Sequence, residues 1–449
     1  MANTYIQSPT MANPPTGASK KGTWSFWMKK CNLGQHRFFG TYENGNNECV
    51  FKFKNDDSLQ IYQIAGGSNN LDLTTNRKFV DTNAWFHIVI AVDTTLGTAG
   101  DRVKLYVNGE RETSFATNTN NMPQNHSFHG LYGGVVQYWG RDGGSTSSQF
   151  DGLLSYVAFI DGTQELPTIF GEVDSSSGIW KIKTGITPSS AWGTNGYLVL
   201  KDGNSVTDQS VNSNNFTVGA GTLTPTKDNP SNNYSTMNVL HNYYEGGTYA
   251  NAANEFNTGG SGKYTYNNSS FGVTKGKWYC EYKWVSGGTD MLFGITDRFT
   301  GGATSELGND SQQFGYRSNG TVRNSNGNLG SWTGATFTHG DIIGIALDMD
   351  NNKVYFSKNG AWQNSGNPES GSTGTGAASI SATPRQFHYW FSGCLYDDAA
   401  GVFQSNFGNG YFGTSAISSA GSNGNGSLFE YDCPNGYYAL NTKNINTYG

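Results

Sequence analysis

The feature that most constrains the fold of this chain is a two-residue alternation of apolar and polar side chains along almost its whole length. In residues 22–28 (GTWSFWM), for example, Trp24, Phe26 and Met28 fall on one side of an extended backbone. Turn signals rich in Gly and Asn interrupt the alternation about every 8–12 residues. No segment has a helical period over three turns, and only residues 166–170 are expected to form a short helical turn. The pattern therefore predicts an all-β chain of many short strands.

Composition supports ordered β-structure with an unusual surface. Aromatic residues make up 14% of the 449 residues and glycine occurs 61 times, whereas charged residues make up only 14%. Aromatic side chains favour strands and glycine supplies positive-φ turns, while disordered chains are rich in charge and poor in aromatics. We therefore expect folded domains with a polar but largely uncharged surface. Such a surface suits an extracellular object or a virion part better than a cytosolic enzyme.

Two classes of partner are not expected. The formal net charge is −6 and there is no run rich in Lys and Arg, so the chain lacks the basic stripe that nucleic acid requires. No stretch approaches the roughly 18 apolar residues of a spanning helix, so no membrane insertion is expected. The first residues, MANTYIQSPT, do not have a basic region followed by an apolar run, so no secretory signal is expected either.

A repeated arrangement indicates that the two halves share one architecture. In each half a long apolar strand ends in Asp, and a short turn then leads to a K-x-Y strand that closes on Asn-Gly. Asn-Gly is a type I′ hairpin signal, so the arrangement could be generic hairpin chemistry; its position in the middle of each half favours a shared fold. The segments are 85–93, 104–106 and 108–109 in the first half and 340–350, 353–355 and 359–360 in the second.

The segment between the halves does not have the composition of a flexible linker. Residues 171–236 are rich in Gly, Ser, Thr and Asn, yet they include Trp180, Trp192, Tyr197 and Phe216. A pure linker would not carry so many large apolar groups. We expect an ordered bridge with a strand at 196–200 that packs on one or both sandwiches. The predicted domains are thus a β-sandwich over 1–170, a bridging segment over 171–236 with short strands, and a second β-sandwich over 237–449.

Each half also resembles a known family. In the first half GTWSFWMKK, NAWFHIVIAVDTT, RVKLYVNGE and DGLLSYVAFIDG resemble the laminin-G-like branch of concanavalin A-like domains (residues 22–30, 83–95, 102–110 and 151–162). In the second half GKWYCEYKW, FGITD, GDIIGIALDMDNNKVYFSKNGAW and FQSNFGNGYF resemble a SPRY domain (residues 276–284, 293–297, 340–362 and 403–412). These resemblances imply two concanavalin A-like jelly-roll β-sandwiches in tandem, joined by an ordered bridge.

The bridge resembles the connecting segment of two-domain structural proteins of marine tailed bacteriophages. The residues that carry this resemblance are AWGTNGYLVLKD, VNSNNFTV and DNPSNNYSTMNVL, at 191–202, 211–218 and 228–240. It implies a virion protein, a tail fibre or another surface appendage, assembled in the host cytoplasm and released by lysis. The implied partners are other virion proteins, a host cell-surface glycan or protein, and further copies of the chain. A homotrimer is the expectation for a fibre, although no heptads enforce one.

The sequence does not predict an enzyme, and no catalytic residues or cofactor are expected. Glycosidases need two carboxylates that flank the sugar bond, and no Glu-x-Asp-x-Glu triplet places them on one strand face here. The nearest candidate, Asp348-Met349-Asp350, sits at a strand end before a turn, so turn-forming Asp is the better interpretation. There is no G-x-S-x-G, and the Gly-rich stretch 143–148 lacks the Lys of a phosphate loop.

Candidate ligand-binding residues are aromatic and polar residues expected in loops. Sugar recognition needs aromatic faces and hydrogen-bonding side chains, usually on loops. SPRY domains use such loops to hold peptides or protein surfaces. The alternative is that these aromatic residues are core. The candidates are Tyr138, Trp139, Arg141 and Asp142 in the first half, and Tyr316, Arg317, Trp332 and Trp362 in the second.

Calcium is a secondary expectation from the laminin-G resemblance, because these domains sometimes bind it through hard oxygen ligands at the sandwich rim. Asp93, Asp142 and Asp161 are the candidate ligands, and ordinary turn Asp is the alternative. The five cysteines are scattered, so they indicate neither a zinc site nor a disulfide framework. Whether Cys31 and Cys49 pair across two strands is left open.

Three functions follow from these observations. The leading hypothesis is a phage appendage whose lectin-like domains bind a host-surface glycan or protein. The second is a purely structural virion decoration or adaptor protein without receptor binding. The third, a secreted glycan-active enzyme, is disfavoured by the missing carboxylate triplet.

Overall fold

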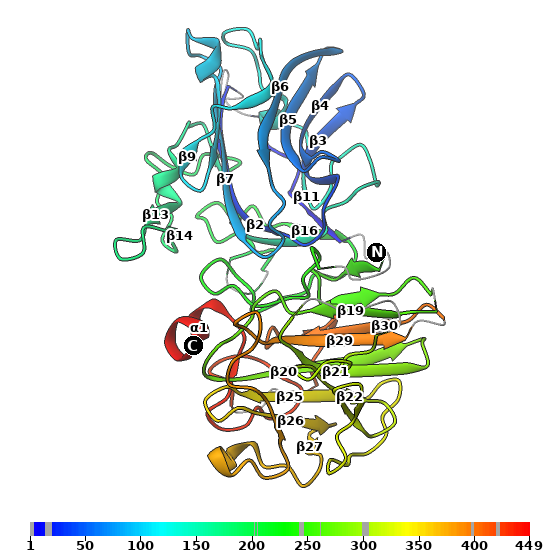
Figure 1. The fold of residues 1–449 in the computed structure, drawn as a ribbon. Helices are drawn as coiled ribbons and strands as arrows, with labels where there is room; N and C mark the ends of the chain where they lie inside the picture. The colour runs from blue at the N-terminus through cyan, green and yellow to red at the C-terminus, as the bar shows by residue number, and fades with distance from the viewer. Residues whose placement is uncertain are drawn as a thin grey trace. The chain divides into compact units, whose positions relative to one another are not determined.

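The computed structural model describes residues 4–13, 20–201, 203, 205–241, 247–260, 262–298, 305–396, 399–418 and 423–449. The chain divides into two compact units, Met1–Pro225 and Thr226–Gly449. In both, the regular secondary structure is almost entirely β-strand, which confirms the predicted fold class (Figure 1). In the described residues the α-helical content is one short helix, α1 (Thr442–Tyr448), and no helix there is long and apolar enough to cross a membrane.

Unit 1 is a sandwich of an eight-stranded and a six-stranded sheet. The eight-stranded sheet has the order β10 (Phe115–Asn120), β6 (Ser68–Lys78), β5 (Ser58–Ala65), β4 (Asn47–Phe53), β3 (His36–Asn44), β11 (Gln137–Trp139), β1 (Tyr5–Gln7), β16 (Thr217–Ala220). The six-stranded sheet has the order β15 (Tyr197–Val199), β12 (Gly152–Asp161), β2 (Lys21–Lys30), β7 (Trp85–Asp93), β8 (Val103–Val107), β9 (Glu110–Arg111). A hairpin of β13 (Gly171–Val173) and β14 (Trp180–Ile182), and the 3-10 turns η1 (Ala99–Asp101), η2 (His129–Leu131) and η3 (Pro167–Ile169), complete the unit.

The alternation in β2 builds the core of unit 1. Trp24, Phe26 and Met28 are completely buried between the two sheets, as the sequence predicts. The Trp24 ring stacks on Phe159 of its own sheet at 4.9 Å and meets Phe51 of the opposite sheet edge-on at 5.7 Å. Aromatic pairs of this geometry add stability beyond the area that they bury. The inward row of large rings therefore holds the two sheets together.

The segment expected to bridge the domains is divided between the two units. The expected strand at 196–200 is present as β15, which pairs with β12, and β16 pairs with β1. Tyr197 and Val199 are buried in the core of unit 1. Residues 171–225 are therefore an integral part of the first sandwich.

Unit 2 is a second sandwich. Its nine-stranded sheet runs β17 (Thr248–Ala250), β18 (Glu255–Asn257), β30 (Val402–Asn406), β20 (Lys277–Ser286), β25 (Ile342–Asp348), β26 (Lys353–Lys358), β27 (Ala361–Trp362), with β28 (Ala378–Ser379) on β26 and β33 (Tyr438–Ala439) parallel to β20. The facing sheet runs β19 (Tyr264–Asn268), β29 (Trp390–Tyr396), β21 (Asp290–Thr296), β22 (Phe314–Arg317), β23 (Val322–Asn324), β24 (Gly327–Asn328). The unit also contains a short hairpin of β31 (Tyr411–Phe412) and β32 (Ser415–Ala416) and the 3-10 turn η4 (Pro368–Thr373).

The Asn-Gly hairpins play the same part in both units. Asn108 and Asn359 both have positive φ, as do the glycines that follow them, so both turns match the type I′ prediction. The Asn108 side-chain oxygen accepts a hydrogen bond from the His87 backbone N–H at 2.8 Å. The Asn359 oxygen accepts from Ile342 N–H, also at 2.8 Å. This detail supports one shared architecture for the two halves.

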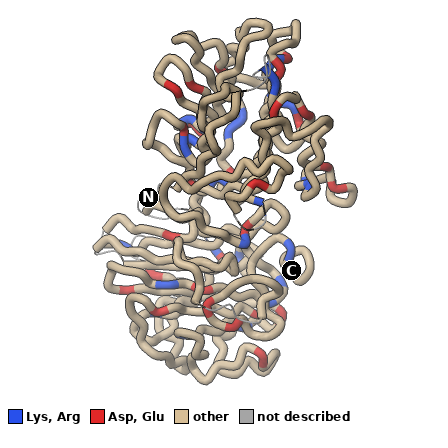
Figure 2. The backbone as a smooth tube through the Cα atoms, turned by 180° about the vertical axis from the view of Figure 1, so that it is seen from behind, with Lys and Arg blue, Asp and Glu red and all other residues tan. Residues whose placement is uncertain are grey.

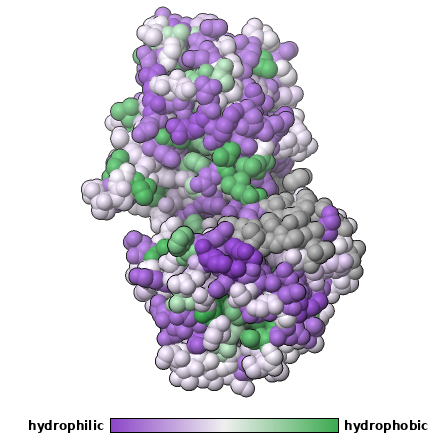
Figure 3. All heavy atoms as spheres, in the orientation of Figure 1, coloured by the Kyte–Doolittle hydropathy of each residue, from purple (hydrophilic) through white to green (hydrophobic). Residues whose placement is uncertain are grey.

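The surface and the cysteines agree with the composition. Basic and acidic residues are sparse and interspersed in both units (Figure 2), and the face in Figure 3 is largely hydrophilic or neutral with separate hydrophobic patches. All five cysteines lie in the described ranges as buried thiols, so Cys31 and Cys49 are not joined.

Candidate functional site

The candidate site is an open pocket of about 420 Å³ at one end of the six-stranded sheet of unit 2. Four neighbouring strands bring its side chains together. Tyr264 begins β19, Tyr396 ends β29, Asp290 begins β21 and Arg317 ends β22. Because adjacent strands run antiparallel, these ends meet at one edge: Tyr396 pairs with both Tyr264 and Asp290. Thr289, Ser318 and Asn319 complete the lining.

A bidentate ion pair forms the polar floor of the pocket. Arg317 Nε lies 2.9 Å from Asp290 Oδ1 and Nη2 lies 2.6 Å from Oδ2. The Tyr264 hydroxyl donates to Asp290 Oδ2 at 2.9 Å and the Ser318 hydroxyl donates to Oδ1 at 3.3 Å. Burial and the charge of Asp290 raise the pKa of Tyr264 far above its usual range, so the phenol stays a neutral donor. These contacts hold the polar side chains of the pocket in place without a ligand.

The charges around the pocket cancel. Glu306 lies beneath Arg317, with Oε2 at 3.3 Å from Nη1, and its other oxygen pairs with Arg323. Two carboxylates, Asp290 and Glu306, therefore face two guanidinium groups. No uncompensated charge faces the opening among these four groups.

The pocket walls are aromatic and amphipathic. The Tyr264 and Tyr396 rings lie 5.0 Å apart at 57°, so together they offer two tilted ring surfaces rather than one closed stack. Both residues are half-buried. Aromatic walls with a few convergent hydrogen-bonding groups are typical of small-molecule and sugar sites. The arrangement can bind a neutral polyol.

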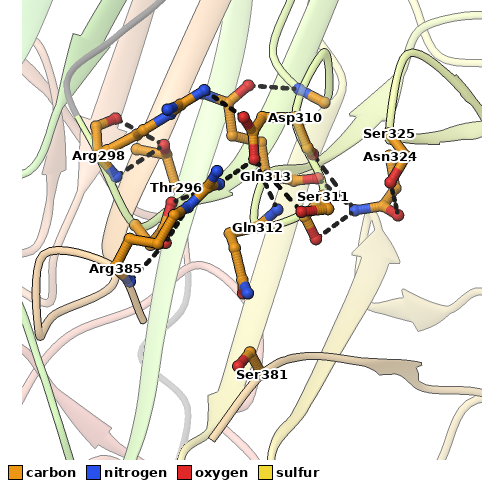
Figure 4. A network of polar contacts seen from close by, with 12 residues as sticks. Thr296, Arg298, Asp310, Ser311, Gln312, Gln313, Asn324, Ser325, Ser381 and Arg385 are labelled. Carbon is orange, nitrogen blue, oxygen red and sulfur yellow. Dashed lines mark hydrogen bonds and ion pairs between the residues drawn. The ribbon is translucent and has the colours of Figure 1, made fainter. Parts of the chain in front are cut away.

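The opposite end of the same sheet is closed by a polar network (Figure 4). Arg298 and Arg385 both form ion pairs with Asp310. The Asn324 side-chain amide donates to the backbone oxygens of Ser311 at 3.0 Å and Gln313 at 2.9 Å. This network stabilises the loop that precedes β22.

Among the candidates predicted in unit 2, Arg317 lies in the pocket. Tyr316 and Trp332 do not, because they are buried core residues whose rings lie 5.1 Å apart. For these two residues the structure matches the alternative interpretation, that the aromatic residues are core. Trp362 is half-buried and packs edge-on against Tyr355.

Of the candidates predicted in unit 1, two are buried and two are half-buried. Trp139 is a core residue whose indole N–H donates to the Tyr197 hydroxyl at 2.8 Å, so its ring is not available to a ligand. Asp142 is also buried; it pairs with Arg37 and accepts from Ser145 N–H at 2.6 Å. Tyr138 and Arg141 are half-buried at the outer face of the eight-stranded sheet.

The predicted calcium ligands do not gather. Asp93 and Asp161 lie at the ends of β7 and β12, on either side of β2, while Asp142 lies in a loop of the other sheet. Asp93 contacts Lys21 at 3.0 Å, and Asp161 accepts two hydrogen bonds from Asn195, both at 3.1 Å. In the part of the chain that the structure describes, no group of three or more His, Cys, Asp or Glu is placed to hold a metal ion. These residues do not fit a calcium site, and calcium binding stays a prediction.

Sequence reasoning missed Tyr264, Asp290 and Tyr396. Each lies at the end of a strand, where alternation gives no indication of function. Only the pairing of β19, β29, β21 and β22 brings them together, and Tyr396 lies more than a hundred residues along the chain from Tyr264 and Asp290. The local signal that was present is the polar turn after β22, Ser318–Asn319.

Two family models match the chain. The concanavalin A-like lectin/glucanases superfamily matches residues 1–169, and the SPRY domain matches residues 277–368. No curated protein matches the sequence.

Solved structures resemble single units of the chain. The SPRY domain of human HERC1 is 21% identical and covers 34% of this chain and 87% of its own, with a TM-score of 0.27. A heptameric SAP-like pentraxin from Limulus polyphemus is 16% identical, covering 36% of this chain and 72% of its own (TM-score 0.28). Domain 4 of an extracellular arabinanase from Geobacillus stearothermophilus is 19% identical, covering 32% and 63% (TM-score 0.25). Such distant resemblance says nothing about ligands. The family matches identify a concanavalin A-like domain in the first unit and a SPRY domain in the second, in tandem along one chain.

Proposed function

We propose that this protein is a bacteriophage virion protein, a tail fibre or another surface appendage, that binds a host-surface glycan. The observation that carries the binding role is the pocket in unit 2, where Tyr264 and Tyr396 form tilted walls over the Asp290–Arg317 pair. A sugar ring offers C–H faces to such rings and hydroxyls to such polar groups. The pocket volume of about 420 Å³ suits a small part of a glycan, one or two sugar units.

The assignment to a virion rests on the sequence. The bridge, with AWGTNGYLVLKD at 191–202, resembles that of tailed-phage structural proteins, and the charge-poor polar surface suits an exposed particle component. On this proposal the protein resides in the virion, contacts other virion proteins, and forms homo-oligomers. The role is binding without catalysis, because Asp290 and Glu306 are both held in ion pairs and no Glu-x-Asp-x-Glu triplet occurs.

A binding assay tests the glycan role. We expect the full chain to bind purified polysaccharides from the surface of its host on a glycan array. Tyr264→Ala and Tyr396→Ala should each weaken binding about tenfold, as loss of an aromatic contact at a binding centre does. Tyr448→Ala removes an exposed tyrosine outside the pocket and serves as the control.

The outcome also separates the alternatives. If no host polysaccharide or host-cell surface is bound while antibody labelling finds the protein on the particle, the purely structural role replaces this proposal. Release of reducing sugar from a bound polysaccharide would replace it with an enzymatic role.

A further inference from the structure

Arg141 differs from the other arginines of the chain. Of the nine arginines, seven form ion pairs with a carboxylate. Arg102 is buried and donates to three backbone carbonyl groups instead. Arg141 is half-buried, and among the described residues it pairs with no carboxylate. In a chain with so few charges, an uncompensated guanidinium at the surface needs an explanation.

Two tyrosines hold the Arg141 guanidinium in place. Its central carbon lies 4.9 Å from the centre of the Tyr5 ring and 5.5 Å from that of Tyr138, and the two rings are 6.0 Å apart. Cation–π contacts of this kind stabilise a partly desolvated cation. Nε donates to Asp142 O at 2.6 Å and Nη2 donates to Gly143 O at 3.2 Å. The guanidinium therefore lies against both tyrosine rings and is held along one edge by the backbone.

The outer face of the sheet is shaped for this cluster. Ile6 and Trp139 pair across β1 and β11 and point into the core, so Tyr5 and Tyr138, next to them, point outward. A Cβ at Gly219 would lie 2.1 Å from the Tyr5 ring, so only glycine leaves room for it. Gly140, with φ +96°, makes the turn that brings Arg141 back over the strands.

The free donors of Arg141 define the ligand. A guanidinium has five N–H donors in a planar fork. Two are used by the backbone carbonyls, and among the described residues no partner is recorded for the other three, which include the end-on pair on Nη1 and Nη2. That pair matches two oxygens of a carboxylate or sulfate.

We propose that Tyr5, Tyr138 and Arg141 form a subsite for an acidic sugar of a glycan, with the anionic group on Arg141 and the sugar against the tyrosines. The subsite rests on the proposed function in that its ligand is a glycan, but it uses no residue of the pocket. The shared chemistry is an anionic oxygen group on a sugar, which a uronate and a sulfate ester both supply.

Calorimetric titration of the full chain tests the subsite. The probes are oligogalacturonate for a carboxylate, dextran sulfate for a sulfate, and neutral dextran. We expect one acidic probe to bind, and Arg141→Gln to weaken it about tenfold or more, since a charge-assisted bond is lost. Arg141→Lys keeps the charge but loses the planar pair of donors, so its affinity for the acidic probe should lie between those of the wild type and Arg141→Gln. Arg111→Gln, an exposed arginine of the same unit that pairs with Asp101, is the matched control.

Several results would overturn the subsite. They are binding of neither acidic probe, unchanged binding by Arg141→Gln, or equal weakening by Arg111→Gln. Inorganic sulfate that binds as tightly as the acidic probe would show a simple anion site and also overturn it. Near-ultraviolet circular dichroism checks that each variant is folded. If Arg141→Gln is not folded, Tyr138→Phe and Arg141→Lys replace it in the titration. Loss of glycan binding only in Tyr264→Ala and Tyr396→Ala would refute the subsite and leave the proposed function intact. Loss of glycan binding only in Arg141→Gln would refute the pocket as the glycan site.

Discussion

Glu281 is a glutamate that is fully buried in the fold of unit 2. It lies in β20 with its side chain buried, and its two oxygens accept hydrogen bonds from the backbone N–H groups of Glu430 and Tyr431, each at 2.8 Å. Asn406 Nδ2 donates to it at 3.1 Å. The carboxylate thus ties the C-terminal segment to the centre of the nine-stranded sheet. Burial outweighs these donors and raises the pKa of Glu281 to about 7.

This raised pKa predicts how stability depends on pH. In the unfolded chain Glu281 titrates near its ordinary value of 4.5. The folded state holds the proton of Glu281 more tightly than the unfolded chain does. The resulting contribution to the free energy of unfolding is therefore complete below about pH 4.5 and is lost as the pH rises through about 7. Glu281→Gln cannot titrate, so the difference in unfolding free energy between variant and wild type should shift by about 3 kcal/mol in favour of the variant from pH 4.5 to 8.

Urea unfolding of both proteins at the two pH values measures that shift, and Glu369→Gln, an exposed glutamate, is the control. A constant difference between Glu281→Gln and wild type across this range would contradict the prediction.

At the residue scale, alternation indicates that neighbours face opposite ways but not which of them faces the core. Tyr316 and Arg317 illustrate this limit. Both were predicted as ligand residues; Tyr316 points into the core and Arg317 into the pocket. The phase is set by the facing sheet, where Phe356 packs against Tyr316. That contact joins distant segments and is not visible in the local sequence.

At the scale of elements, the predicted bridge has a structural role that its composition only partly indicates. Tyr197 of β15 is buried, and its hydroxyl donates to Gln137 at 2.6 Å while it accepts from Trp139. We therefore expect a fragment of residues 1–225 to fold and a fragment of residues 1–170 to fail, because the latter leaves the β12 edge and the Trp139 indole without their partners. Cooperative thermal unfolding, followed by circular dichroism, distinguishes the two.

Tyr197→Phe in the longer fragment isolates the hydroxyl, and a loss of about 1–3 kcal/mol is expected for two buried groups left without a partner. If residues 1–170 unfold with the same midpoint as residues 1–225, the bridge is not part of the first sandwich.

Elements with large apolar residues were predictable from sequence and polar ones were not. The strand expected at 85–93 is β7 with the same bounds. By contrast β6 carries mostly Asn, Thr and charged residues around Leu71 and Leu73, and it was not foreseen. Its outward face is polar and its inward face includes buried Thr75, so the contrast between its two faces is weak. Strands of that kind are specified by their neighbours in the sheet.

At the scale of the whole molecule, each unit has its own core and its own candidate ligand site. The pocket is lined only by residues of unit 2, and the Tyr5–Tyr138–Arg141 subsite only by residues of unit 1. A protein with two separate sites gains from presenting several copies together, because later contacts form at a high effective concentration. Oligomerisation, expected for a virion component, would thus convert modest sites into firm attachment.

The proposed fibre role predicts a trimer, and the multivalency argument predicts that it binds with strong avidity. Light scattering of the full chain should give about three times the 48.5 kDa of one chain. On a surface coated densely with a bound glycan, the trimer should be retained roughly 10²–10⁴-fold more tightly than the fragment of residues 226–449. In solution, a short oligosaccharide of the same glycan that enters only the pocket should bind the two equally, because the pocket lies wholly within that fragment. A monomeric mass would contradict the trimer, and equal retention on the dense surface would show that the copies do not bind together.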